Sequence, residues 1–228
     1  MRPKVQSGRS ETITDEIERA RAQEYALLAV LLAGAPNGDL LTQIAGLTGA
    51  ASPLGQAHAA LALAAGAAEC ERVEREFFDL FVGVGRGELM PYGSYYVTGT
   101  LHAAPLARLR ADLATLGISR AERCSEPEDH AGLLCEIMAG LVDGRFGTPL
   151  GADRRVFEKH LAPWIGRFFG DLQTAKNAKF YRAVGVVGQR FVEIESEAFR
   201  LADRENGSWS EQRNAKRDEQ PADIGAAT

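Results

Sequence analysis

The chain has 228 residues, 45% of them hydrophobic, which is enough to bury one sizeable core. Its 31 Asp and Glu outnumber its 26 Lys and Arg, and the resulting charge of −5 argues against a nucleic-acid binder, which needs a basic surface. The longest apolar stretch, residues 57–68, is too short to span a bilayer and contains a histidine, so we expect no stable membrane insertion.

The first third of the chain is typical of four helices. Apolar residues at three- and four-residue steps predict a helix over 11–33, which Gly34 ends. Ser52 and Pro53 predict the N-cap and first residue of the third helix, because serine accepts from first-turn amides and proline needs no donor there. The expected helices span residues 11–33, 39–47, 53–68 and 71–82.

A loop over residues 83–94 interrupts this pattern, since it contains four glycines and a proline. It also keeps leucine, methionine and tyrosine, and apolar loops often line binding sites. Further helices are expected over 105–116, from the acidic residues near 126 to 141, over 153–161, from 163 onward, and over 180–201. The last of these has the clearest helical periodicity in the chain.

No segment alternates apolar and polar residues long enough to predict a strand. We therefore expect an all-α fold, a compact bundle of roughly nine to eleven helices in a single domain over residues 11–205. A hinge is expected near residues 117–126. The polar tails, residues 1–10 and 206–228, are expected to be disordered.

The most informative segment is Glu126-Pro127-Glu128-Asp129-His130, which we call the acidic segment. Ser125 before it and Glu128 three residues later have the spacing of a capping box, which predicts that a helix begins here and runs to Leu141. Three carboxylates gathered in one turn favour a cation as partner, either a metal ion or a basic side chain.

Three cysteines, Cys70, Cys124 and Cys135, form no Cys-x-x-Cys pair, and an odd number argues against a disulfide framework. Reduced thiols in a cytoplasmic protein are the simplest interpretation.

Four motifs in order resemble the TorD/DmsD/NarJ family of redox-enzyme maturation chaperones, and its TorD/DmsD branch most closely. The resemblance covers roughly residues 17–201. Val84 departs from the pattern, since many relatives carry proline after the preceding glycine. The motifs are Phe77-Phe78-Asp79-Leu80-Phe81-Val82-Gly83, then Pro91-Tyr92-Gly93-Ser94-Tyr95, then the acidic segment, and last His160-Leu161-Ala162-Pro163-Trp164 with Phe168-Phe169 and Phe180-Tyr181-Arg182-Ala183-Val184-Gly185.

The resemblance implies a cytoplasmic, all-helical, TorD-like chaperone and not an enzyme. Such proteins bind the twin-arginine leader of a molybdenum-containing oxidoreductase precursor and delay its export until the cofactor is inserted. It implies no bound cofactor or metal, although weak guanine-nucleotide binding is associated with some members. It also implies a monomer or a domain-swapped dimer. The sequence does not name the client.

A leader with two arginines and an apolar stretch needs carboxylates for the guanidinium groups and an apolar groove beside them. The acidic segment supplies the carboxylates, and the two preceding motifs supply apolar side chains. The predicted leader-binding residues are Leu80, Phe81, Pro91, Tyr92, Glu126, Pro127, Glu128, Asp129 and His130.

Simpler interpretations stay open at this point. The carboxylates would also stabilise a helix N-terminus without binding anything. His130 would serve as a cap or hinge residue, or be held protonated by the acids around it. Phe81 is typical of a core position. The glycines of the loop lack the Lys-Ser/Thr of a phosphate-binding loop.

Two other functions compete with the chaperone. A metal-dependent enzyme would use Glu126 and His130 with Glu158 and His160, although Glu158 and His160 are two apart and would diverge on a helix. A helical adaptor would bind a folded partner through its surface, without a peptide groove.

Overall fold

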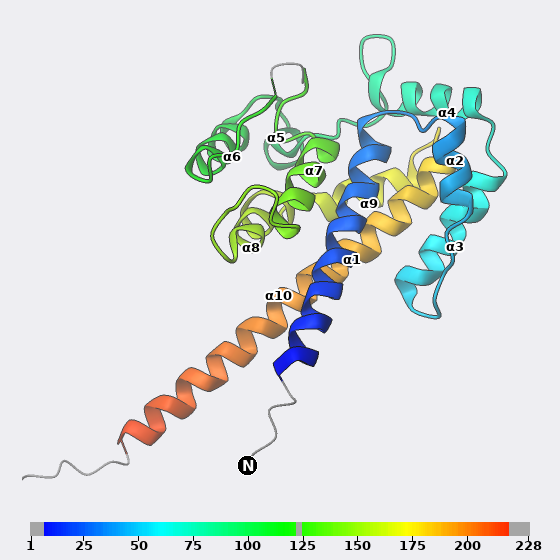
Figure 1. Ribbon diagram of the computed structural model, residues 1–228. Helices are drawn as coiled ribbons and strands as arrows, with labels where there is room; N and C mark the ends of the chain where they lie inside the picture. The colour runs from blue at the N-terminus through cyan, green and yellow to red at the C-terminus, as the bar shows by residue number, and fades with distance from the viewer. Residues whose placement is uncertain (1–6, 122–124, 219–228) are drawn as a thin grey trace, which may run out of the picture. The chain divides into compact units, whose positions relative to one another are not determined.

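The computed structural model describes residues 7–121 and 125–218, with side chains described for 15–121 and 125–204 (Figure 1). In this part of the chain ten α-helices and two π-helical turns form an all-α fold, as the sequence predicts, and no strand is present beyond one isolated bridge. Two compact units divide at Val192 and Glu193. The helices are α1 (Ser7–Ala33), α2 (Gly38–Ala45), α3 (Pro53–Gly66), α4 (Cys70–Phe77), η1 (Phe78–Val82), α5 (Gly93–Thr98), α6 (Ala104–Thr115), α7 (Ala131–Val142), α8 (Ala152–Val156), η2 (Phe157–Leu161), α9 (Ile165–Thr174) and α10 (Phe180–Asp218).

The ends of the fold differ from the sequence prediction. α1 begins at Ser7, and α10 continues through residues 206–218, where the sequence predicts disorder. This stretch lacks an apolar stripe, but within it residues 211–217 are rich in Glu, Gln, Arg, Lys and Ala, whose intrinsic preference for helix is high. The remaining parts of the predicted tails, residues 1–6 and 219–228, lie outside the described residues, as does Cys124.

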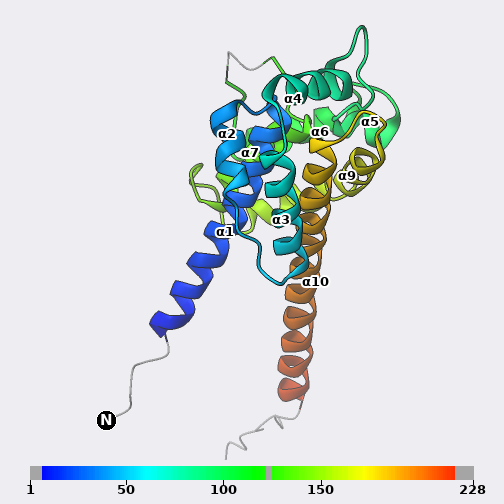
Figure 2. The ribbon, with the colours of Figure 1, turned by 90° about the vertical axis from the view of Figure 1, so that its right-hand side faces the viewer.

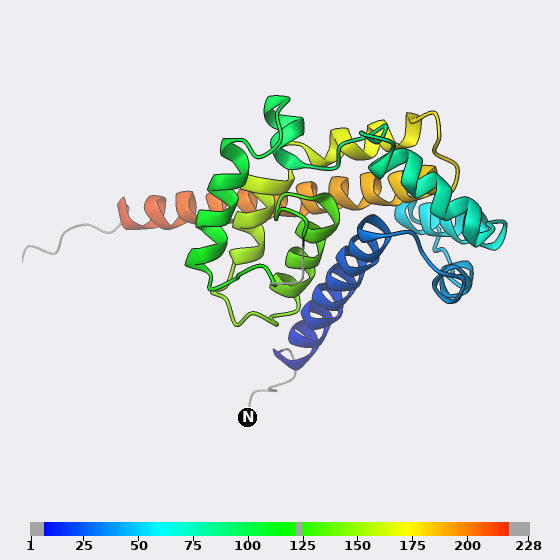
Figure 3. The same cartoon turned by 90° about the horizontal axis from the view of Figure 1, so that it is seen from above.

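At the centre of the first unit, α1 packs most closely against α7 (Figures 1 and 3). Gly132 makes this approach possible, because a Cβ there would lie 3.0 Å from the backbone of Leu32 and 3.2 Å from the carbonyl oxygen of Ala29. α1 also meets α10, where the rings of Tyr25 and Phe191 contact edge to face at 4.6 Å. The start of α7 is thereby fixed against the C-terminal end of α1.

An aromatic cluster joins the π-helical turn η1 to α9 and α10. The ring of Phe81 lies 5.3 Å from Tyr181 and 6.4 Å from Phe168. Phe77 lies 5.1 Å from Phe81. Edge-on ring pairs such as these add about 0.5–1.5 kcal/mol each to the burial of their area. The cluster therefore anchors Phe77 and Phe81 of the first motif, while Phe78 and Val82 stay exposed.

Glu76 on α4 caps α10 from a distance of more than 100 residues. Its carboxylate accepts hydrogen bonds from the backbone N–H groups of Lys179 (2.8 Å), Phe180 (3.2 Å) and Tyr181 (2.7 Å). Glu76 is 9% exposed. A carboxylate at a helix N-terminus satisfies donors that have no partner within the helix and also opposes the helix dipole. Figure 2 shows α4 and the first turns of α10 at the same end of the unit.

α1 and α3 are joined by a histidine–carboxylate pair. His58 Nε2 lies 3.0 Å from both carboxylate oxygens of Glu24, and Glu24 is buried. The hydrogen bond to Glu24 raises the pKa of His58 above its usual value, although burial opposes part of the shift. Protonated His58 is therefore the form that the fold stabilises.

We expect this pair to make stability fall as the pH rises above about 6.5, the ordinary pKa of histidine. The folded state keeps its proton to a higher pH than the unfolded state, so the stabilisation is complete below pH 6.5 and is lost as the pH passes the folded-state pKa. Urea unfolding at pH 6, 7 and 8 tests this prediction. His58→Gln should remove most of the decline over this range, and an unchanged decline in that variant would contradict it.

Among the described residues, no helix combines the length and apolar character that crossing a bilayer requires.

Candidate functional site

Residues 88–93, which we call the connector, join η1 to the acidic segment. At one end, the Leu89 N–H donates to the carbonyl of Leu80 at 2.8 Å. At the other, the Ala131 N–H donates to the carbonyl of Pro91 at 2.7 Å. The isolated bridge between Tyr92 and His130 lies next to this second bond. Two motifs that are about 35 residues apart in sequence are thus paired through their backbones.

Asp129 links the acidic segment to α5 through its side chain. The residue is 3% exposed, and its Oδ2 accepts the Ser94 N–H at 2.7 Å. This bond caps α5 at a position where no local side chain does so. Because its cap comes from another segment, α5 is not evident in the sequence, where residues 93–94 read as loop. Asp129 Oδ1 and Ser94 Oγ have no hydrogen-bond partner within the described residues.

The acidic segment does not begin α7, so the predicted capping box at Ser125 and Glu128 is wrong. α7 begins at Ala131, and its N-cap is His130, whose Nδ1 accepts the Gly132 N–H at 3.2 Å. The connector explains the shift, because its backbone bonds hold His130 in an extended conformation that a helix would break. The carboxylates therefore stand before the helix rather than on its first turn.

Burial favours the neutral form of His130, in contrast to the alternative interpretation that the nearby acids hold it protonated. Burial lowers its pKa, and the charges of Glu126 and Asp129 oppose this only in part. Since Nδ1 accepts a hydrogen bond, the ring proton is on Nε2. The unfolded chain takes up this proton at a higher pH than the folded chain, so His130 lowers stability as the pH falls below about 6.5.

Glu126 is held by Tyr92. The Tyr92 hydroxyl donates to Glu126 Oε2 at 2.7 Å, and its ring lies edge to face with His130 at 5.2 Å. Burial raises the pKa of Tyr92 well above its usual value, with the hydrogen bond to Glu126 as the second cause. The tyrosine therefore stays protonated and acts as a donor. Pro91 is buried and Pro127 is half-buried, so both support this corner.

Glu128 forms an ion pair with Arg110 of α6, with Nε 2.7 Å from Oε2. The Glu128 side chain is 13% exposed, whereas that of Arg110 is 49% exposed. Arg120 donates to the backbone carbonyls of Ser125 and Glu126. Each of the three carboxylates therefore has a partner in the protein, in contrast to the open acidic surface that the sequence suggests.

A groove of about 480 Å³ lies between α6 and α7, and Glu128 is on its edge. Its floor is apolar, because Leu113, Ile118 and Ile137 contribute to it and all three are buried. We call it the α6–α7 groove. Its lining residues are Arg110, Leu113, Ala114, Ile118, Ser119, Arg120, Ala121, Glu128, Leu133, Glu136, Ile137, Arg145 and Phe146.

The end of α6 shapes one side of the groove. Gly117 has a φ of +71°, and the N–H groups of Gly117 and Ile118 donate to the carbonyls of Ala114 (3.1 Å) and Leu113 (3.0 Å). This is a Schellman motif, which usually brings an apolar contact between the residues that flank the turn. Here the flanking residues are Leu113 and Ile118. This turn falls in the region where the sequence suggests a hinge.

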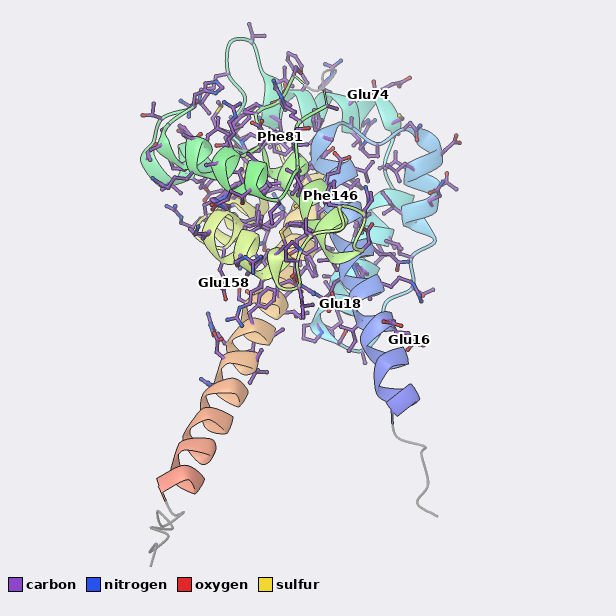
Figure 4. The ribbon with its side chains drawn as sticks, turned by 60° about the vertical axis from the view of Figure 1, so that its left-hand side comes forward. Glu16, Glu18, Glu74, Phe81, Phe146 and Glu158 are labelled. Carbon is purple, nitrogen blue, oxygen red and sulfur yellow. The ribbon has the colours of Figure 1, made fainter. Side chains whose placement is uncertain are left out.

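The groove residues other than Glu128 were not among the sequence predictions, and two of them, Glu136 and Phe146, are informative. Glu136 is exposed on α7 and has no basic partner among the described residues. Glu136 is the single charged residue in the otherwise apolar helix α7. This isolated charge is the feature of the sequence that indicates a functional position. Phe146 (Figure 4) lies in the loop after α7, and its ring rests on Gly140, where a Cβ would lie 2.4 Å from it. Only the fold brings this ring to the groove.

The apolar residues predicted to bind the leader lie elsewhere. Leu80 of η1 is fully buried, and Phe81 is part of the aromatic cluster. They support the connector through the backbone bond at Leu80. Of the nine predicted residues, Glu128 is the one that lines the α6–α7 groove.

The residues that a metal-dependent enzyme would use pair with different partners in the protein. Glu158 on η2 pairs with Arg154 at 2.8 Å, and His160 Nε2 lies 2.7 Å from Asp112 Oδ2. Within the described residues no group of three or more His, Cys, Asp or Glu is placed to hold a metal ion. Cys135 is buried, and burial raises the pKa of its thiol to about 12, which makes it unreactive.

Comparisons with known proteins agree with these motifs. A family model described as the nitrate reductase delta subunit matches residues 48–170. The chaperone protein TorD of Vibrio cholerae serotype O1 is 28% identical over 102 residues, which covers 41% of this chain and 46% of that protein. The Tat proofreading chaperone DmsD of Haemophilus influenzae is 25% identical over 119 residues, which covers 51% of this chain and 57% of that protein.

The solved structure of a redox enzyme maturation protein from Archaeoglobus fulgidus has a TM-score of 0.49 and 18% identity, covering 76% of this chain and 93% of that one. The chain spans about half the length of the curated relatives it matches. The family match is broader, since it takes in more than half of the 228 residues and includes the acidic segment. The chain therefore belongs to the nitrate reductase delta subunit family, the TorD/DmsD/NarJ family of redox-enzyme maturation chaperones.

Proposed function

We propose that this protein is a cytoplasmic chaperone that binds the twin-arginine leader of a molybdenum-containing oxidoreductase and assists its maturation before export. Family membership supports the general role, and the relatives TorD and DmsD are named as a chaperone and as a Tat proofreading chaperone. The observation that carries the proposal for this chain is the α6–α7 groove, where an apolar floor meets two carboxylates, Glu128 and Glu136.

The chemistry of the groove fits the two parts of such a leader. The apolar stretch of the leader packs on Leu113, Ile118 and Ile137, where buried apolar area contributes about 25 cal/mol per Å² before the cost of ordering the peptide. The guanidinium groups pair with Glu128 and Glu136, since planar guanidinium binds a carboxylate through two parallel hydrogen bonds. The other acidic-segment residues hold Glu128 in position rather than contact the leader.

The three arginines that line the groove do not compete strongly with a cationic peptide for the carboxylate of Glu136. Arg145 pairs with Asp143 at 2.7 Å, and Arg120 is bonded to backbone carbonyls. Arg110 is occupied by Glu128. Glu136 therefore keeps an unneutralised negative charge on the groove wall within the described residues.

We expect a synthetic Arg-Arg leader to bind, and a matched Lys-Lys leader to bind at least about tenfold more weakly, because lysine cannot form the paired hydrogen bonds. Isothermal titration calorimetry with both peptides measures this difference. Equal binding of the two peptides would contradict recognition of the arginines.

A second candidate is an adaptor that binds the folded enzyme body. Phe78 (42% exposed) and Val82 (51% exposed) on η1, with Val84 beyond them (97% exposed), form an apolar surface on the first unit. Binding of the mature enzyme without binding of either leader would favour this function over the leader-binding chaperone.

A further inference from the structure

The ion pair between Arg110 and Glu128 resembles the contact that the proposed function requires. A guanidinium group already sits against the groove carboxylate, at 2.7 Å, and it comes from the protein itself. The two partners differ in their surroundings, since the Glu128 side chain is 13% exposed and that of Arg110 is 49% exposed. Glu128 is therefore fixed in the wall, while Arg110 reaches it from solvent.

This asymmetry decides which partner can leave. A shielded carboxylate is costly without a cation, so Glu128 needs a positive partner at all times. An exposed arginine loses little when it turns into water, because surface ion pairs contribute little to stability. Arg110 lies on α6, whose buried face carries Leu106, Leu109 and Leu113, so the helix stays in place when the side chain moves.

We propose that Arg110 holds, in the free protein, the place at Glu128 that a leader arginine takes, so that the leader binds by exchanging one guanidinium for another. This inference rests on the proposed function. Arg110 is then an internal competitor that lowers the affinity for every leader. It lowers the affinity for Arg-Arg and Lys-Lys leaders by the same factor, because both bind only after the same ion pair has opened.

The test compares the wild type with Arg110→Ala by calorimetric titration of the Arg-Arg and Lys-Lys leaders. Arg108→Ala is the matched control, since Arg108 is also exposed on α6 but does not line the groove. We expect Arg110→Ala to bind the Arg-Arg leader about 2- to 5-fold more tightly, the range that one exposed ion pair allows. Its affinity for the Lys-Lys leader should rise by the same factor, so that the preference for arginine is unchanged. Arg110→Lys should lie between the two.

A second variant distinguishes the exchange from an indirect effect, in which the substitution loosens α6. In Arg110→Ala with Glu128→Gln, no carboxylate remains for the exchange, so the gain in affinity should disappear, whereas a general loosening of α6 would preserve it. Far-UV circular dichroism confirms that each variant is folded.

The outcomes separate the two proposals. If the wild type binds the Arg-Arg leader and Arg110→Ala binds it no more tightly than Arg108→Ala does, the exchange is wrong and the proposed function stands. Weaker binding by Arg110→Ala would show that Arg110 is a direct contact and would also overturn the exchange. If no variant and no wild-type protein binds either leader, the proposed function fails and the exchange fails with it.

Discussion

Glu76→Ala should lower the free energy of unfolding by about 3–5 kcal/mol. The substitution leaves the N–H groups of Lys179, Phe180 and Tyr181 without their acceptor, and each buried donor without a partner costs about 1–3 kcal/mol. It also removes a negative charge from the N-terminus of α10. Urea unfolding followed by circular dichroism measures the change.

Two controls make the result specific to the cap. Glu76→Gln keeps one acceptor oxygen and should lose less than Glu76→Ala. Glu74→Ala removes a carboxylate from the exposed face of the same helix and should change stability by no more than about 0.5 kcal/mol. A loss below about 1 kcal/mol for Glu76→Ala would show that water or another group replaces the carboxylate.

Asp129→Ala should destabilise the protein by about 2 kcal/mol, since the buried Ser94 N–H loses its acceptor and the cap of α5 is lost. A residue that only contacted the leader would give no such loss. Asp129→Asn keeps an acceptor for Ser94 and should lose less than half as much. Thermal or urea unfolding of the three proteins tests this order, and wild-type stability in Asp129→Ala would mean that the residue is free for a ligand.

Asp129 also explains where the sequence and the structure differ. Helices with their own apolar stripe or their own cap were predictable, such as α3, where the Ser52 side chain accepts the Gly55 N–H at 3.1 Å. α5 was not, because its capping group comes from 35 residues away. The start of α7 was misplaced for the same reason, since local capping-box geometry at Ser125 competes with the backbone bonds of the connector and loses.

The candidate site was predictable in part. The clustered carboxylates drew attention to Glu128, which does line the α6–α7 groove. Their partners were not predictable, because Arg110, Tyr92 and Ser94 approach only in the folded chain. Phe146 reaches the groove through a loop whose course no periodicity encodes. The apolar residues around Leu80 and Phe81 were assigned to a groove although their pattern fits a core equally well.

Photo-crosslinking tests the central claim, that the leader lies in the α6–α7 groove beside Glu128, most directly. An Arg-Arg leader with a photoreactive residue two positions after the arginines is irradiated with the protein, and the linked residue is identified by mass spectrometry. The account predicts crosslinks to the groove residues Leu113, Ile118, Leu133, Ile137 and Phe146 that an excess of unlabelled Arg-Arg leader suppresses. Crosslinks confined to Phe78 and Val82 on η1, or crosslinks that the unlabelled leader does not suppress, would contradict it.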